Sequence, residues 1–181
     1  MNLYDLRTEY RVNPIGITSL KPRFSWKINS EENNTVQKSY HVVVKNGDTV
    51  VFDSGVVESS QSVLVEYRGD ALLSETLYHV EVEVVDNHEH QAKGKMTFET
   101  ALFDHTEFKA EMITHDFADD ETACPVFEKE FNTDKEIASA RLYATAHGVY
   151  EVHLNGHRVG EDRMTPGWTS YHNRLQYQTY D

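Results

Sequence analysis

The sequence predicts an all-β protein made of two sandwich-type units. Short segments in which apolar and polar residues alternate recur along the 181 residues, and turn-forming residues separate them. About seven such segments fall in the first ~100 residues, which is the strand count of a β-sandwich domain. A hydrophobic fraction of 39% with 11% aromatic residues is sufficient for packed cores.

The first unit is expected to span residues 1–102. Its clearest strand is 78–84, where Tyr78, Val80, Val82 and Val84 alternate with His79, Glu81 and Glu83 and would share one sheet face. The other predicted strands are 24–28, 40–44, 50–52, 63–67 and 95–100, and the sequence Asn46-Gly47-Asp48 is a turn signal. The absence of a cysteine pair favours a fibronectin type III-like over an immunoglobulin-like sandwich.

Residues 103–123 are expected to form a linker, because the alternation fails there and acidic residues collect in Asp119-Asp120-Glu121. Phe108 and Met112 are spaced for one short helical turn. Four apolar side chains suggest that the linker lies against the domains: Phe103, Phe108, Met112 and Phe117.

The second unit is expected to span residues 124–181, with strands resuming at Cys124 and continuing through an alternating run at 138–146. Asn155-Gly156 predicts a tight hairpin, Thr165-Pro166-Gly167 a second reversal, and 175–180 a last strand. This gives four or five strands, whereas a jelly roll needs about eight. We therefore expect the N-terminal part of a jelly-roll sandwich, whose open sheet edges would favour self-association.

Two packing expectations concern this second unit. Cys124, the single cysteine, is interpreted as a small buried side chain, because no basic neighbour marks it as a reactive thiol. The alanines at positions 138, 140, 144 and 146 share one face and would let a bulky ring, Trp168 or Tyr150, pack closely over them.

The charge balance excludes some partners. Thirty acidic residues against 17 basic ones give a formal net charge of -13, which repels nucleic acid and anionic membrane surfaces. No apolar run is long enough to cross a bilayer. The first ten residues, MNLYDLRTEY, lack the features of a signal peptide, so we expect a cytoplasmic protein and leave secretion open.

No catalytic, cofactor or metal site is predicted. Glu81 and Glu83, like Glu128 and Glu130, fit the solvent face of a strand better than an acid and base pair. His88-Glu89-His90 lacks further spaced ligands and is expected to be a hairpin tip. The acidic residues 116–121 lack the spacing of a calcium loop.

One group of residues is retained as a candidate functional site: Trp168, Tyr171, His172 and Arg174. Aromatic faces stack on the apolar faces of sugar rings, and polar neighbours can bind hydroxyl groups. The alternative is structural, with Trp168 anchoring the loop in its own core or against another protein part.

Two stretches near the C-terminus, GVYEVHLNGHRVG and TPGWTSYHNRLQYQTYD, resemble the N-terminal β-sandwich module of bacterial α-L-rhamnosidases of glycoside hydrolase family 78. Upstream, LRTEY at 6–10, KPRFSW at 21–26 and Asp53-Ser54-Gly55 resemble the fibronectin type III-like module that precedes it. The resemblance covers nearly the whole chain.

The resemblance implies that this chain is a non-catalytic N-terminal piece of a glycosidase that removes terminal α-L-rhamnosyl groups with inversion. The catalytic carboxylates would then lie in a helical barrel after Asp181, which would be the main partner of this part, beside rhamnose-containing saccharides. A free-standing carbohydrate-binding module and a purely structural pair of sandwiches remain the alternatives.

Overall fold

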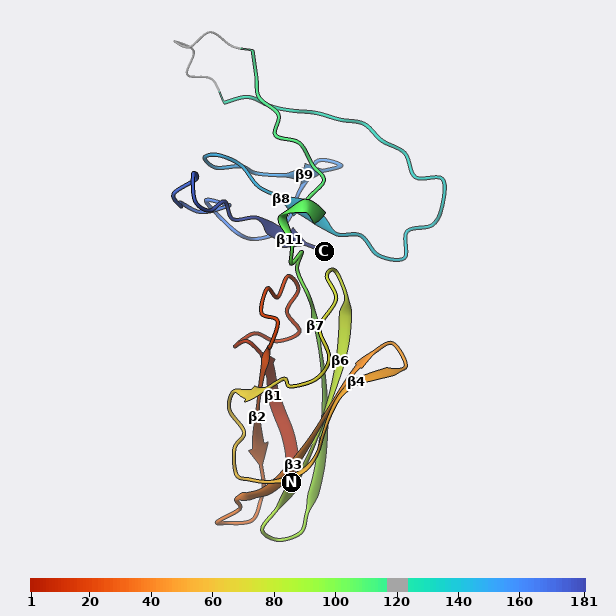
Figure 1. Cartoon of the computed structure of the whole chain (residues 1–181), viewed down its shortest axis with the longest axis vertical. Coiled ribbons are helices and arrows are strands. Elements are labelled where there is room, and N and C mark those ends of the chain that lie inside the picture. The colour runs from red at the N-terminus through yellow and green to blue at the C-terminus, as the bar shows by residue number, and fades with distance from the viewer. Residues whose placement is uncertain (117–123) are drawn as a thin grey trace. The chain divides into compact units, whose positions relative to one another are not determined.

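The computed structural model describes residues 1–116 and 124–181 (Figure 1). The chain separates into two compact units, Met1–Glu107 and Phe108–Asp181. The described residues form strands and one short 3-10 helix, η1 (His105–Glu107), so the predicted all-β class is confirmed. The described residues contain no helix longer than η1, so none of them could cross a membrane as a helix.

The first unit is a sandwich of two antiparallel sheets (Figure 1). One sheet has the order β1-β2-β5 and the other β4-β3-β6-β7. The strands are β1 (Asn2–Thr8), β2 (Arg23–Asn29), β3 (Gln37–Asn46), β4 (Thr49–Glu58), β5 (Val65–Glu66), β6 (Leu77–Asp86) and β7 (Gln91–Glu99). The fourth strand pairs with β3, whereas constant-type immunoglobulin domains place their fourth strand on the other sheet.

The core lies between these sheets, where the alternation predicted it. All four apolar residues of the β6 inner face are at most 1% exposed. Phe98, on the neighbouring strand β7, and Phe24, on β2 of the other sheet, are fully buried as well. The rings of Tyr78 and Phe98 stack at 5.1 Å, and those of Trp26 and Tyr40 meet edge to face at 5.5 Å. The predicted inward face of 78–84 is therefore confirmed.

The turns of this unit also agree with the sequence. Gly47 has a φ of 55° between β3 and β4, at the predicted Asn46-Gly47-Asp48 turn. His88-Glu89-His90 forms the tip of the β6–β7 hairpin, where Asp86 N donates to His90 O at 3.0 Å.

The sequence pattern did not reveal β1. Its pairing with β2 is irregular between Tyr4 and Arg7, and Asp5 has a φ of 49° there. The Asp5 carboxylate binds Arg7 Nε at 2.8 Å and Lys27 Nζ at 2.7 Å, and both contacts lower its pKa. The bulge breaks the period of two, which is the signal that identifies a strand.

Gln37 joins three parts of the sandwich through one buried side chain. Its Oε1 accepts a hydrogen bond from Trp26 Nε1 at 2.8 Å, and its Nε2 donates to Ser59 O at 2.9 Å and Gln61 O at 2.8 Å. Gln37 is 6% exposed and Trp26 1%. The amide thus connects β2, β3 and the segment after β4.

Two of the motifs that carry the family resemblance meet in an ion pair. Glu9, in LRTEY, accepts from Arg23 Nη2 at 2.6 Å and Nε at 3.0 Å, and also from Arg23 N at 2.8 Å. This paired contact lowers the pKa of Glu9. The guanidinium also lies 5.6 Å from the centre of the Tyr10 ring.

A backbone carbonyl anchors the segment after β5. Val51 O, in β4, accepts from Asp70 N at 3.0 Å and from Tyr67 Oη at 3.3 Å, and Tyr67 Oη also contacts Asp70 O at 2.7 Å. Burial of the ring raises the pKa of Tyr67 to about 12. Gly69 lies directly against this junction, since a Cβ there would sit 2.2 Å from Val51 O.

The second unit contains four short strands among its described residues. They are β8 (Leu142–Ala144), β9 (His153–Leu154), β10 (His157–Arg158) and β11 (Gln178–Tyr180). They pair as β8–β11 and β9–β10. Asn155 and Gly156 have φ values of 51° and 79°, which confirms the predicted Asn-Gly hairpin turn.

The strand and packing expectations for the start of this unit are wrong. No strand is formed at 124–141, and Cys124 is exposed. Phe127 and Phe131 are 53% and 66% exposed, because no second layer among the described residues covers this stretch. Alternation therefore indicated a strand that has no partner to pair with.

The first strand of the hairpin is shorter than expected, and one of the two rings expected over the alanine face does not pack there. The β9 strand covers His153–Leu154 and not the whole of 150–154, and Leu154 is 52% exposed. Trp168 is 92% exposed, so it does not pack over the alanine face. Tyr150, the other candidate, does reach that run, since its Oη donates to Ala144 O at 3.2 Å.

The predicted helical turn is misplaced. Helix η1 ends at Glu107, just before Phe108, and the Glu107 carboxylate accepts from Ser74 Oγ at 2.7 Å. Of the apolar linker residues, Phe103 packs on the first core, Phe108 lies 5.8 Å from Tyr177, and Met112 is 57% exposed. Phe117 and Asp119-Asp120-Glu121 lie outside the described residues.

Candidate functional site: an aromatic platform in the second unit

Three aromatic side chains of the second unit contact one another in a row, here called the aromatic platform: His147, Tyr171 and Trp168. The His147 and Tyr171 rings stack almost in parallel, 5.0 Å apart with an interplanar angle of 7°. The Trp168 ring follows at 6.2 Å from Tyr171, tilted by 40°. Two segments about 20 residues apart in the chain thus present one group of rings.

One backbone contact holds the Tyr171 ring. Tyr171 Oη accepts a hydrogen bond from Gly148 N at 3.0 Å, which ties the 168–171 turn to the 147–148 turn. Gly148 has a φ of 109°, a backbone conformation that side chains other than glycine rarely adopt. The Tyr171 ring is therefore held by a backbone contact in addition to its stacking on His147.

The loop that carries Trp168 closes on itself. Arg174 N donates to Ser170 O at 2.9 Å, and Thr169 Oγ1 donates to Arg174 O at 2.5 Å. At its start Gly167 N donates to Met164 O at 3.1 Å, which confirms the predicted reversal at 165–167. The loop is held as a turn at both ends.

Beneath the loop, a polar cluster around Tyr150 anchors the unit. Tyr150 Oη contacts Gln178 Oε1 at 2.8 Å and Tyr180 Oη at 3.2 Å, and Tyr150 N donates to Thr165 O at 2.9 Å. Burial, reinforced by the Tyr180 hydroxyl, raises the pKa of Tyr150. A Cβ at Gly160 would lie 2.4 Å from Tyr180 Cε1, so only glycine fits under that ring.

Of the four candidate residues, the structure brings two together in ring contact, Trp168 and Tyr171. His172 and Arg174 are exposed on the same turn, and neither side chain forms a hydrogen bond or ion pair with the described residues. Sequence reasoning missed His147. The only local signal is its place before Gly148, and its stacking partner is far along the chain.

The β6–β7 tip brings two histidines near one carboxylate. His88 Nδ1 and His90 Nε2 lie 3.5 Å and 3.6 Å from the two Glu32 oxygens, and His90 Nδ1 lies 3.3 Å from buried Asp86. The two imidazole rings are 6.1 Å apart. No group of three potential ligands in the described ranges can hold a metal ion.

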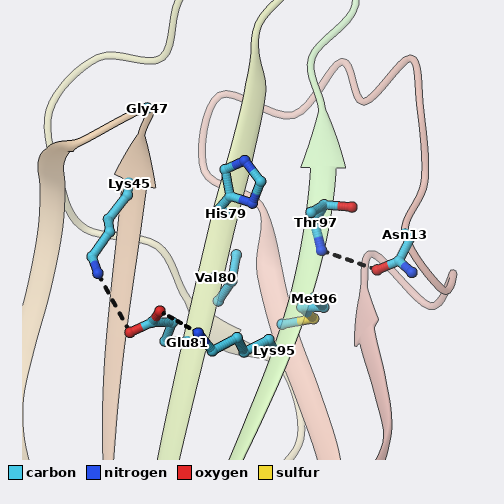
Figure 2. A pocket seen from close by; sticks show the side chains of 9 residues that line it. All are labelled: Asn13, Lys45, Gly47, His79, Val80, Glu81, Lys95, Met96 and Thr97. Carbon is cyan, nitrogen blue, oxygen red and sulfur yellow. Dashed lines mark hydrogen bonds and ion pairs between the residues drawn. The ribbon is translucent and has the colours of Figure 1, made fainter.

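A shallow hollow of about 370 Å³ lies on the outer face of β3, β6 and β7 (Figure 2). Glu81 occupies its centre between Lys95, at 3.1 Å, and Lys45, at 3.4 Å, and the Lys95 contact is the main cause of its lowered pKa. Asn13 Oδ1 accepts from Thr97 N at the rim (Figure 2). The carboxylate is already neutralised by its neighbours.

In glycoside hydrolysis one catalytic acid needs a raised pKa. Every carboxyl group in the described ranges whose pKa departs from its ordinary value has it lowered, through hydrogen bonds to cations, imidazoles, hydroxyls or backbone N–H groups. These are Asp5, Glu9, Asp53, Glu81, Asp86, Asp104, Glu107 and Glu151. They are stabilised as anions.

Comparisons with known proteins match both units. The family model described as "Rha78A-like, N-terminal immunoglobulin domain" matches residues 3–104, and the one described as "Alpha-L-rhamnosidase N-terminal domain" matches residues 135–181. An alpha-L-rhamnosidase from Formosa agariphila is 32% identical over 93% of this chain and 20% of its own length. One from Streptomyces avermitilis is 66% identical over 26% of this chain and 5% of its own length.

Solved structures give the same result. The alpha-L-rhamnosidase from Dictyoglumus thermophilum superposes on 99% of this chain with a TM-score of 0.83 and 29% identity, and 23% of its own chain is covered. The chain thus spans about a fifth of the length of the curated relatives that it matches over most of its length.

The sandwich of the first unit and the small second unit of short strands define a pair of β modules. More specifically, the chain belongs to the Rha78A-like family through its N-terminal immunoglobulin domain, and it corresponds to the N-terminal region of α-L-rhamnosidases.

Proposed function

We propose that the chain is the non-catalytic N-terminal part of an α-L-rhamnosidase, which hydrolyses terminal α-L-rhamnosyl groups from glycosides with inversion. The observation that carries this proposal is the match across 93% of the chain to an enzyme of which it covers 20%. The role of this part is to hold and position a catalytic region that further residues supply.

The chemistry of the described residues supports an auxiliary role. Their shifted carboxyl groups are all stabilised as anions, whereas an inverting glycosidase needs one protonated acid and one base roughly 6.5–9.5 Å apart. The dense core of the first unit, with Trp26, Phe24 and the β6 valines at most 1% exposed, fits a rigid spacer.

The 181-residue chain is expected to release no aryl alcohol from an aryl α-L-rhamnoside, whereas a protein extended by the residues that follow Asp181 in its gene is expected to turn it over. Release of the chromophore is followed for both proteins with the same preparation and a mock-purified control. Turnover by the 181-residue chain at a rate above that control would contradict the proposal.

One observation favours a second function, a free-standing carbohydrate-binding module. Trp168 is 92% exposed on a fixed loop, as a sugar-stacking residue would be. The nucleotide sequence after the codon for Asp181 distinguishes the two: several hundred further residues support the enzyme, and an immediate stop codon supports the module.

We also propose that the chain associates with itself through the open edges of its second unit. Val126, Phe131 and Leu154 there are 91%, 66% and 52% exposed, and short two-stranded sheets leave backbone groups unpaired. Sedimentation velocity is expected to show an average mass that rises with protein concentration. A constant monomer mass over a roughly hundredfold range of protein concentration would refute this.

A further inference from the structure

The chain contains two asparagine–glycine pairs, Asn46-Gly47 and Asn155-Gly156. At such a pair, the main-chain nitrogen of the glycine can attack the side-chain amide carbon of the asparagine. Glycine favours this attack, because it has no Cβ to restrict the backbone. The two pairs carry the same reacting groups, so a difference in reactivity between them must come from the structure around each turn.

The reaction at such a pair needs only water. Gly156 N bonds to Asn155 Cγ, the Cγ–Nδ2 bond breaks, and Nδ2 leaves as ammonia with the proton from Gly156 N. Water then adds to one of the two carbonyl carbons of the resulting succinimide and opens the ring. Opening at Cγ gives aspartate. Opening at the main-chain carbonyl carbon of Asn155 gives isoaspartate, in which the side-chain methylene group becomes part of the main chain.

Asn155 and Gly156 are exposed and held by few contacts. They form the turn between β9 and β10, strands of two residues each that pair only with each other among the described residues. Just beyond them, Val159 N donates to Val152 O at 2.8 Å. Neither the Asn155 side chain nor Gly156 N forms a hydrogen bond within the described part of the chain. A two-stranded hairpin this short is marginally stable, so its turn opens often.

Asn46 lies in a more strongly held position. It is the half-buried last residue of β3, a strand of ten residues that pairs with β4 on one side and β6 on the other. Its own partners are Thr49 in β4 and Tyr78 in β6. Tyr78 is 1% exposed and stacks on Phe98 in the core. Opening of the turn at Asn46 therefore disturbs a paired and packed strand, and it occurs less often.

Ring closure requires such an opening. Asn155 and Gly156 have φ values of 51° and 79°, as a tight hairpin turn demands. To face Asn155 Cγ, Gly156 N must rotate about the Asn155 Cα–C bond, and this rotation is incompatible with the closed turn. The rate of succinimide formation therefore follows the frequency with which each turn opens.

We propose that Asn155 is a site of spontaneous modification to aspartate and isoaspartate, whereas Asn46 is protected by its place in the four-stranded sheet. The inference goes beyond the function proposed above and does not depend on it, because no catalytic region takes part in the reaction.

Peptide mass spectrometry tests this on the 181-residue chain. The folded chain is incubated at mildly alkaline pH and digested at intervals under acidic conditions. The fraction of each Asn-Gly peptide that has gained the mass of the acid gives the rates at Asn46 and Asn155. We expect Asn155 to convert roughly tenfold faster than Asn46 or more, because its turn opens more often. Electron-transfer fragmentation identifies the isoaspartate in the product.

Unfolding provides the matched control. In concentrated urea both turns are lost, so the ratio of the two rates is expected to fall to about one. Asn155→Gln is expected to abolish conversion in its own peptide, because a glutamine would have to close a larger ring, and to leave the rate at Asn46 unchanged.

Two results would overturn the proposal. One is a rate at Asn46 equal to or above that at Asn155 in the folded chain. The other is a ratio that stays at roughly tenfold in urea, since the difference would then come from the neighbouring sequence and not from the fold. Neither result bears on whether the chain is part of a rhamnosidase.

Discussion

Replacing Gln37 with alanine lowers the free energy of unfolding of the first unit by about 3 kcal/mol. The substitution leaves Trp26 Nε1, now 2.8 Å from Gln37 Oε1, without an acceptor inside the core. A buried donor that loses its partner costs about 1–3 kcal/mol, and the carbonyls of Ser59 and Gln61 lose their donor as well. Urea unfolding followed by the buried Trp26 measures the change.

Gln61 provides the matched control. It is an exposed glutamine of the same unit, whose amide donates to Val63 O at 3.1 Å, so Gln61→Ala should change the stability by less than about 0.5 kcal/mol. Adding Trp26→Phe to the Gln37→Ala background should cost less than Trp26→Phe alone, because the stranded N–H is removed. Equal losses for Gln37→Ala and Gln61→Ala would show that the bridge contributes nothing.

The first unit could be predicted largely because its strands obey one rule, an apolar residue every second position against one core. In β6, the apolar residues Tyr78, Val80, Val82 and Val84 follow it without exception and are all buried. Strand β1 was not predicted, because Asp5 and the bulge between Tyr4 and Arg7 interrupt the pattern. A bulge is defined by its partner strand, which a single sequence does not display.

The hydrogen bonds of Gln37 could not be predicted from the sequence for a related reason. A glutamine next to an apolar run is compatible with a solvent-facing position, and nothing local shows that Trp26, Ser59 and Gln61 converge on it. Buried polar networks are set by tertiary contacts, so alternation alone cannot find them.

The second unit shows where local signals suffice. Asn155-Gly156 was predictable because both residues must adopt positive φ in such a turn, whatever surrounds them. The structure of the run from Cys124 was not predictable, because a strand needs a neighbouring strand. Residues 124–141 pair with no other strand among the described residues. Trp168 and Tyr171 were selected as site candidates from their chemistry, whereas His147 contacts Tyr171 only in the folded chain.

Gly69→Ala is expected to lower the stability of the first unit by about 2–3 kcal/mol, although Gly69 is on the surface. An added Cβ would lie 2.2 Å from Val51 O and 2.7 Å from both Phe52 Cβ and Tyr67 Oη. Two of these atoms belong to β4, so the clash cannot be relieved by rotating a side chain end. The 67–70 segment must move away instead.

That movement also breaks hydrogen bonds. Val51 O accepts from Asp70 N at 3.0 Å and from Tyr67 Oη at 3.3 Å, and both contacts depend on the close approach at Gly69. The Tyr67 hydroxyl would lose its contact with Val51 O, and this loss adds to the steric cost. The loss is measured as the shift of the urea midpoint at unchanged slope.

Gly94→Ala tests whether the backbone obstacle is the cause. A Cβ at Gly94, in β7, would meet Leu6 Cδ2 at 2.7 Å, which is the far end of a flexible side chain, and Leu3 Cβ at a looser 3.3 Å. We expect a loss below about 1 kcal/mol, because Leu6 can change rotamer and alanine suits a strand better than glycine. If both glycine variants lose the same stability, the rigid junction between β4 and the 67–70 segment does not control the fold as argued.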